Sequence, residues 1–155
     1  EEKILHNGHW EETAEDSTET RGFFIEDDGG FQKPLEFWIG AMTFTPDAKI
    51  LITGSRDNTI RFFEMPTMNE LRVLRGHNGW VRSLTVSPDG KVLISSGDDN
   101  TIRFWDIATG RNFRTDKTHT GPVRGVALSP DGLRLASASW DRTVKLWEGG
   151  QEPAE

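Results

Sequence analysis

The chain has 155 residues, of which 34% are hydrophobic, with six Trp, nine Phe and no Cys, and its formal net charge at pH 7 is −7. The absence of Cys excludes disulfides, thiolate metal sites and cysteine nucleophiles, and the negative charge argues against an electrostatic nucleic-acid binder. No apolar run approaches the length of a membrane helix, and no signal-peptide pattern occurs.

The first predicted segment, residues 1–35, is an acidic leader. Residues 1–36 hold 11 acidic and 3 basic side chains, whereas residues 37–155 hold 14 acidic and 15 basic ones. The leader is either a degenerate repeat or a disordered linker, and "GFFI" at 22–25 could supply an unpaired strand. "HNGH" at 6–9 could bind a metal, but no second cluster completes a coordination shell. We therefore expect a solvated terminal segment with no metal and no cofactor.

After the leader, the chain repeats itself with a period of 42 residues. The segments 34–64, 76–106 and 118–148 align without gaps, and each neighbouring pair is identical at 13 of 31 positions. In the second copy, three predicted strands are "WVRSLTV", "KVLISS" and "TIRFW", separated by the turns "SPDG" and "GDDN". A weaker fourth strand follows in "ATGRNFRT". Both faces of these strands carry apolar residues, so each sheet must be stacked between neighbours.

These copies resemble the WD-repeat β-propeller family. The matching features are "GH" at 76–77, "SPDG" at 87–90 and 129–132, the turn residues Asp99 and Asp141, and "FWD" and "LWE" at 104–106 and 146–148. The period lies within the ~40–45 residues of that family. The resemblance covers residues 36–148 and implies an all-β fold of β-propeller-type blades. Each blade of the family is a four-stranded antiparallel sheet, and the three lie at about 36–75, 76–117 and 118–148, before a polar tail at 149–155 that offers no fourth strand to the third blade.

The resemblance also implies a buried hydrogen-bond chain in each blade, made of His, Ser or Thr, Asp and Trp. The first blade departs from it, because Leu35 and Phe63 stand where the His and Trp would be, and we expect that blade to be the loosest. Ser, His and Asp also form hydrolase triads, but here the set recurs and no nucleophile-elbow sequence surrounds the Ser. We therefore predict a structural network and no enzyme. Its members are His77, Ser95, Asp99 and Trp105 in the second blade, and His119, Ser137, Asp141 and Trp147 in the third.

A propeller binds partners at one end of its blades, and Trp and Arg are the residue types most enriched in binding hot spots. Some candidates precede the turn Asp of each copy, and the others lie at or near the start of the first strand. Trp38 and Trp80 could be exposed there or wedge between blades, whereas Trp140 is expected to be exposed. The predicted partner-binding residues are Trp38, Arg56, Trp80, Arg82, Asp98, Arg124 and Trp140.

Three blades cannot close a ring of the usual ~4–8 blades. We expect the last part of a longer propeller, a ring completed by several copies, or an open arc covered by another protein. The chain begins with Glu, which favours a processed product or an excised piece. The predicted function is a non-catalytic scaffold for a protein or peptide partner, in the cytoplasm, with no nucleic acid and no membrane. The alternative is a regulatory or oligomerising module of a larger, enzyme-bearing protein.

Overall fold

A computed structural model describes residues 3–6, 9–12 and 38–148, and the chain divides into two compact units, residues 1–35 and 36–155. In the first unit, β1 (Lys3–His6) and β2 (His9–Glu12) form an antiparallel pair in which His6 lies opposite His9. The intervening sequence, Asn-Gly, strongly favours a two-residue hairpin. The acidic leader therefore contains two strands that the repeat pattern did not predict. The "GFFI" segment, Leu35 and the tail 149–155 lie outside the described residues.

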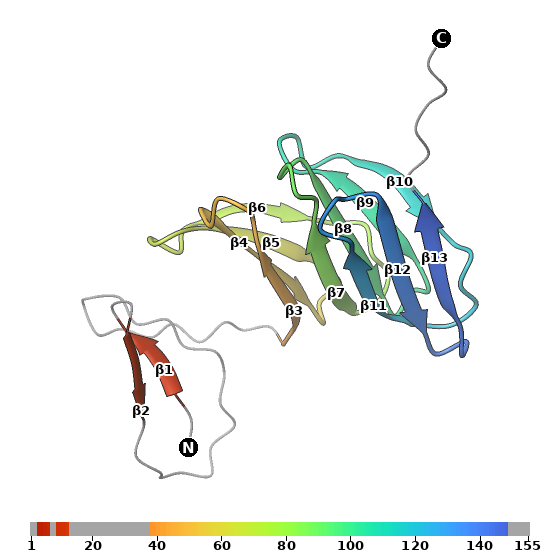
Figure 1. Ribbon diagram of the computed structural model, residues 1–155, viewed down its shortest axis with the longest axis horizontal. Helices are drawn as coiled ribbons and strands as arrows, with labels where there is room; N and C mark the ends of the chain where they lie inside the picture. The colour runs from red at the N-terminus through yellow and green to blue at the C-terminus, as the bar shows by residue number, and fades with distance from the viewer. Residues whose placement is uncertain (1–2, 7–8, 13–37, 149–155) are drawn as a thin grey trace. The chain divides into compact units, whose positions relative to one another are not determined.

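The second unit is built from three antiparallel sheets in which strands pair in chain order (Figure 1). The first contains β3 (Ile39–Phe44), β4 (Ile50–Ser55), β5 (Ile60–Glu64) and β6 (Glu70–Leu74). The second contains β7 (Val81–Val86), β8 (Val92–Gly97), β9 (Ile102–Asp106) and β10 (Asn112–Asp116). The third contains β11 (Val123–Leu128), β12 (Arg134–Ser139) and β13 (Val144–Glu148).

This architecture confirms the predicted all-β fold of WD-type blades. Within residues 38–148, the third sheet has three strands rather than four, and the three sheets do not close into a ring. The first strands β3, β7 and β11 lie side by side (Figure 1), and β7 contacts both of the others. We refer to the three sheets as the first, second and third blades.

Short polar turns reverse the chain between strands. In the second blade, Asp89 Oδ1 accepts hydrogen bonds from the Ser87 hydroxyl at 2.6 Å and from the Lys91 N–H at 3.1 Å. Gly90 completes this turn with a φ of 72°, which glycine adopts without steric cost. The same polar pattern recurs in each copy, and it places successive strands antiparallel.

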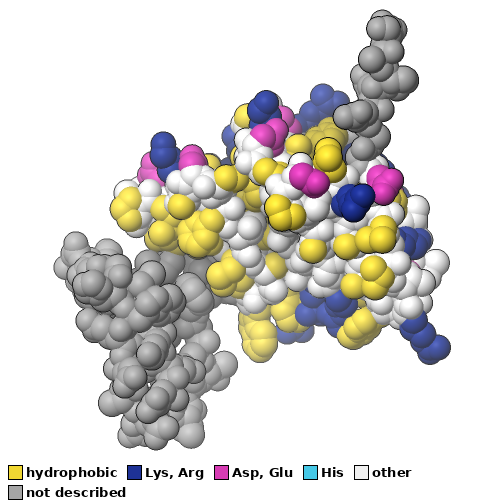
Figure 2. Space-filling view, in the orientation of Figure 1, with side chains coloured by type: hydrophobic (Ala, Val, Ile, Leu, Met, Phe, Trp, Pro, Cys, Tyr) yellow, Lys and Arg dark blue, Asp and Glu magenta, His cyan; other side chains and the backbone are white. Residues whose placement is uncertain are grey.

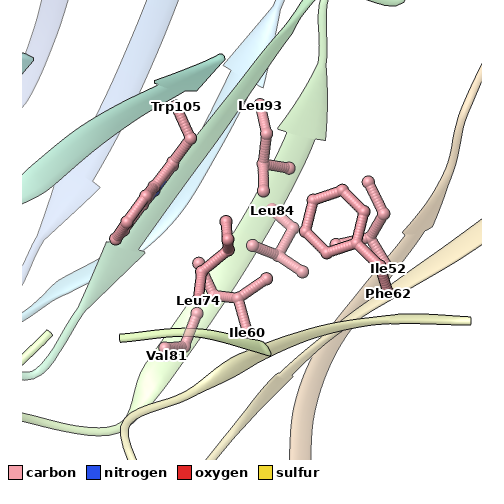
Figure 3. Packing of buried hydrophobic residues seen from close by; sticks show 8 residues of the cluster. All are labelled: Ile52, Ile60, Phe62, Leu74, Val81, Leu84, Leu93 and Trp105. Carbon is pink, nitrogen blue, oxygen red and sulfur yellow. The ribbon is translucent and has the colours of Figure 1, made fainter. Parts of the chain in front are cut away.

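The core lies between the blades, as expected for sheets that are apolar on both faces. Between the first and second blades, eight side chains pack together (Figure 3). Gly54 makes this close approach possible, because a Cβ there would lie 2.5 Å from Val81 Cγ1. A second cluster joins the second and third blades through Ile94, Ile102 and Val123. The first cluster consists of Ile52, Ile60, Phe62, Leu74, Val81, Leu84, Leu93 and Trp105.

The third blade exposes a face that is buried in the other two blades. Val144 is 68% exposed, whereas Ile102 and Ile60, its equivalents one and two repeats earlier, are each 1% exposed. Leu146, on the same face, is 77% exposed. The outer face of β13 therefore retains the apolar residues of a blade-to-blade contact.

Candidate functional site

The four predicted polar residues of the second blade lie together. His77 Nδ1 is 2.8 Å from Asp99 Oδ2, and His77 Nε2 is 2.7 Å from Ser95 Oγ. The Trp105 indole donates to the same Ser95 oxygen at 2.8 Å. With one proton on the imidazole, Nδ1–H donates to the acceptor-only carboxylate and the Ser95 hydroxyl donates to Nε2. The chain of bonds thus joins β8, β9, the turn between them and the segment that precedes β7.

The third blade repeats the arrangement. His119 lies 2.7 Å from both Asp141 Oδ2 and Ser137 Oγ, and the Trp147 indole donates to Ser137 Oγ at 3.1 Å. Ser95 and Ser137 are 0% and 1% exposed. Because these hydroxyls are buried and already hydrogen-bonded, neither can reach a substrate, and the two sets act as structural networks.

The turn acid of each network is held in its charged form. Burial by itself raises the pKa of Asp99, but hydrogen bonds from His77, the Asn78 N–H and Thr101 outweigh it and hold the pKa well below its usual range. For Asp141, the Thr143 hydroxyl is the main cause of a lowered pKa. Since each folded-state pKa lies below the unfolded value of about 3.9, this stabilisation is present above about pH 4 and is lost as the pH falls further.

In the first blade, an ion-pair network surrounds the turn acid. Phe63 is buried at the Trp position and cannot donate a hydrogen bond. Arg61 instead donates to Asp57 at 3.0 Å and to Glu70 at 2.8 Å. Burial raises the pKa of Asp57, but bonds from Thr59 and Arg61 outweigh it and lower the pKa. Sequence reasoning missed Arg61, although an Arg or Lys stands at this position in every copy.

The predicted partner-binding residues meet in one continuous row at the end of the sheets where β3, β7 and β11 begin. In the first half of the row, the Arg56 guanidinium lies 5.5 Å from the Trp38 ring centroid and 5.6 Å from that of Trp80. Arg82 lies closer, 3.5 Å from the Trp80 centroid. Each contact is a cation–π interaction, in which the positive charge is attracted to the negative face of the indole.

A shared carboxylate extends the row to the third blade. Arg82 donates to both oxygens of Asp98, at 2.9 and 2.6 Å. Arg124 donates to Asp98 at 3.3 Å and lies 3.6 Å from the Trp140 ring centroid. The structure thus links all seven residues across three blades, and we call them the Trp–Arg ladder: Trp38, Arg56, Trp80, Arg82, Asp98, Arg124 and Trp140.

The backbone positions the ladder in the same way in each copy. The N–H groups of Arg56, Asp98 and Trp140 donate to the carbonyls at positions 38, 80 and 122, at distances of 2.8, 3.0 and 2.9 Å. The first-strand register shifts at 39–41, 81–83 and 123–125. Such a bulge redirects a side chain, and here it lies at Arg82 and Arg124. In the first blade, the residue is Gly40.

The absence of a side chain at Gly40 leaves room for the neighbouring indole. A Cβ at Gly40 would collide with Trp80 Nε1 and would lie 2.8 Å from the Val81 carbonyl oxygen. Trp80 is half-buried, and its N–H has no hydrogen-bond partner within residues 38–148. Trp80 is therefore wedged between the first two blades.

The two ends of the ladder are open to solvent. Trp38 and Trp140 are 64% and 66% exposed, and Arg56 is also exposed. Figure 2 shows hydrophobic side chains next to Lys and Arg side chains along its lower edge, the end at which β3, β7 and β11 begin in Figure 1. This end therefore offers aromatic surface and positive charge to a partner.

Other kinds of site are not apparent in the described part of the chain. Among residues 38–148, no group of three or more His, Asp or Glu side chains could hold a metal ion. The described residues contain no helix that is long and apolar enough to cross a membrane.

Comparison with known families gives a match to all three repeats. The family model described as "WD40: WD domain, G-beta repeat" matches residues 33–64, 68–106 and 110–148. These segments make up more than half of the chain and include both polar networks and every residue of the Trp–Arg ladder.

Proposed function

The chain belongs to the WD40 family, and from this premise we propose that it is a protein-interaction scaffold whose Trp–Arg ladder binds a peptide segment of a partner protein. WD40 repeats generally mediate protein–protein interaction and are typically non-catalytic. The observation that carries the proposal is the ladder itself, in which two exposed indoles and an exposed arginine lie in one row. Trp and Arg dominate the binding energy of many interfaces.

The ladder is also organised before any partner binds. Arg82 and Arg124 share Asp98, and backbone hydrogen bonds hold the residues on which the ladder is built. Ordering long side chains at an interface costs about 0.5–1.5 kcal/mol each. A partner that docks on side chains already held in place avoids part of that cost, which suits a binding surface.

The proposal predicts that the end indoles are needed for binding. Peptides selected from a random-sequence phage library on the immobilised chain should bind at least tenfold more weakly to a Trp38→Ala/Trp140→Ala variant. Fluorescence anisotropy with labelled peptides measures this change. Leu71 and Phe113 are exposed on β6 and β10 and provide the matched control, Leu71→Ala/Phe113→Ala. Peptides that bind the Trp38→Ala/Trp140→Ala variant as tightly as the parent chain would refute the proposal.

A second candidate function, self-assembly, is favoured by the open face of the third blade. Val144 and Leu146 occupy positions that bury against the next blade elsewhere in the chain. On β3, Met42 and Phe44 are exposed, whereas their equivalents in the second blade, Leu84 and Val86, pack in the core. We propose that β3 of a second copy covers the exposed face of β13, continuing the contact already made between blades.

Self-assembly would appear in the mass of the chain in solution. We expect light scattering after size-exclusion chromatography to give a discrete multiple of the 17.5 kDa chain mass. Leu146→Glu should return the chain to a monomer, because it places a charge in the apolar contact. Leu71→Glu, a matched change on β6, should leave the mass unchanged. A wild-type monomer at every concentration would contradict self-assembly and would favour a segment of a larger protein as the cover.

A further inference from the structure

The three arginines of the Trp–Arg ladder differ in how their charge is neutralised. Arg82 and Arg124 both contact Asp98, at 2.6 and 3.3 Å. Arg56 contacts the rings of Trp38 and Trp80, and within residues 38–148 no carboxylate lies within ion-pair distance of it. Three arginines and one aspartate leave two positive charges on the ladder, and the charge of Arg56 is exposed and forms no ion pair within residues 38–148.

The repeat indicates what Arg56 can bind. Asp98 occupies the position in the second blade that Arg56 occupies in the first. There the carboxylate binds Arg82 through both oxygens, while the Arg82 guanidinium lies over an indole. The ladder thus already contains a guanidinium that contacts an aromatic ring and a carboxylate together. Arg56 also contacts indole rings and is exposed, but unlike Arg82 it binds no carboxylate within residues 38–148.

The chemistry of the guanidinium supports the same ligand. Its five N–H donors lie in one plane and match the two oxygens of a carboxylate. Contact with an indole engages the face of the cation and not those donors. We infer, on the basis of the proposed function, that Arg56 binds a carboxylate of the partner, so that the ladder selects peptides with an Asp or Glu beside an apolar residue. The apolar residue would cover the exposed face of Trp38.

The test uses two small peptides that differ in one group. Acetyl-Leu-Glu-Leu-amide and acetyl-Leu-Gln-Leu-amide are titrated separately into the whole chain, and proton–nitrogen correlation spectra follow the Arg Nε–H and Trp indole signals. We expect the Glu peptide to shift the Arg56 and Trp38 signals and to bind about tenfold more tightly than the Gln peptide, as for loss of one charge-assisted pair.

Substitutions of Arg56 then locate the effect. In Arg56→Ala, the two peptides should bind equally, and in Arg56→Lys the preference for Glu should fall, because a lysine has no planar fork. Arg111 is exposed on the turn before β10, at the other end of the sheets, and Arg111→Ala should keep the full preference. Melting curves of the variants check that each remains folded.

The outcomes separate this inference from the proposed function. If both peptides shift the Trp38 signal equally, the ladder binds peptides but Arg56 does not select an acid, and the inference alone is wrong. The inference is also overturned if Arg56→Ala keeps the tenfold preference, or if neither peptide shifts a ladder signal. Library peptides that ignore Trp38 and Trp140 would instead overturn the proposed function.

Discussion

Replacing Trp105 by Ala is expected to lower the free energy of unfolding by about 3–5 kcal/mol, in the range of large aromatic deletions from a core. Trp105 is 2% exposed and packs in the cluster that joins the first and second blades. The substitution removes that packing and also the indole N–H that donates to Ser95. Urea denaturation followed by circular dichroism measures the change through the transition midpoint.

Two further variants separate the packing of Trp105 from its hydrogen bond. Trp105→Phe keeps a ring but removes the donor, which reproduces the first blade, where Phe63 occupies this position. We expect it to cost about 0.5–1.5 kcal/mol, the usual net value of one hydrogen bond. Trp147 is only half-buried, so Trp147→Ala should cost less than Trp105→Ala. If the two Ala variants lose the same free energy of unfolding, burial between blades does not determine the size of that loss.

Replacing His77 by Ala is expected to lower the free energy of unfolding by about 1–3 kcal/mol. The His77 side chain is 1% exposed and joins Asp99 to Ser95. Its removal leaves a buried carboxylate oxygen and a buried hydroxyl with fewer partners. Thermal and urea denaturation at neutral pH measure the loss. Asn78→Ala is a suitable control, because Asn78 is exposed and contributes only its backbone N–H to Asp99.

The pH dependence of the His77→Ala variant provides an independent check. His77 is a principal cause of the lowered pKa of Asp99. Without it, the folded and unfolded pKa values lie closer together, so the stability of the variant should fall less steeply than that of the parent below about pH 4. An unfolding midpoint equal to that of the parent at all pH values would show that the network does not stabilise the second blade.

The Trp–Arg ladder gives the three blades a common functional surface. Two of its contacts cross from one blade to the next, Arg56 with Trp80 and Asp98 with Arg124. The cores between the blades hold these contacts in register. A substitution at Trp105 or His77 that destabilises the second blade should therefore also disturb the ladder contacts that this blade makes.

The sequence by itself determined the strands and the polar networks of the second and third blades. Strand and turn signals are local, and the repeat of 42 residues places His, Ser, Asp and Trp at the same points of each sheet. The strands of a blade pair in chain order, so these positions meet within a single antiparallel sheet. The sequence alone could therefore predict which residues form each network, for example that His77 and Ser95 belong to the same one.

Only the tertiary structure decided how the seven predicted binding residues relate to one another. Trp80 meets Arg56 of another blade, and this depends on how closely the sheets stack, which Gly40 and Gly54 permit. Stacking and the first-strand bulges also leave Trp38 exposed and Trp80 half-buried, although their positions in the repeat are the same. The contacts of Arg61 with Asp57, in the turn before β5, and with Glu70 on β6 lie within the first blade, and the structure was needed to show them. Contacts between blades join residues that lie far apart in the chain, and no local sequence pattern predicts such pairs. The sequence therefore predicted which residues belong to the Trp–Arg ladder, but not which of them contact one another.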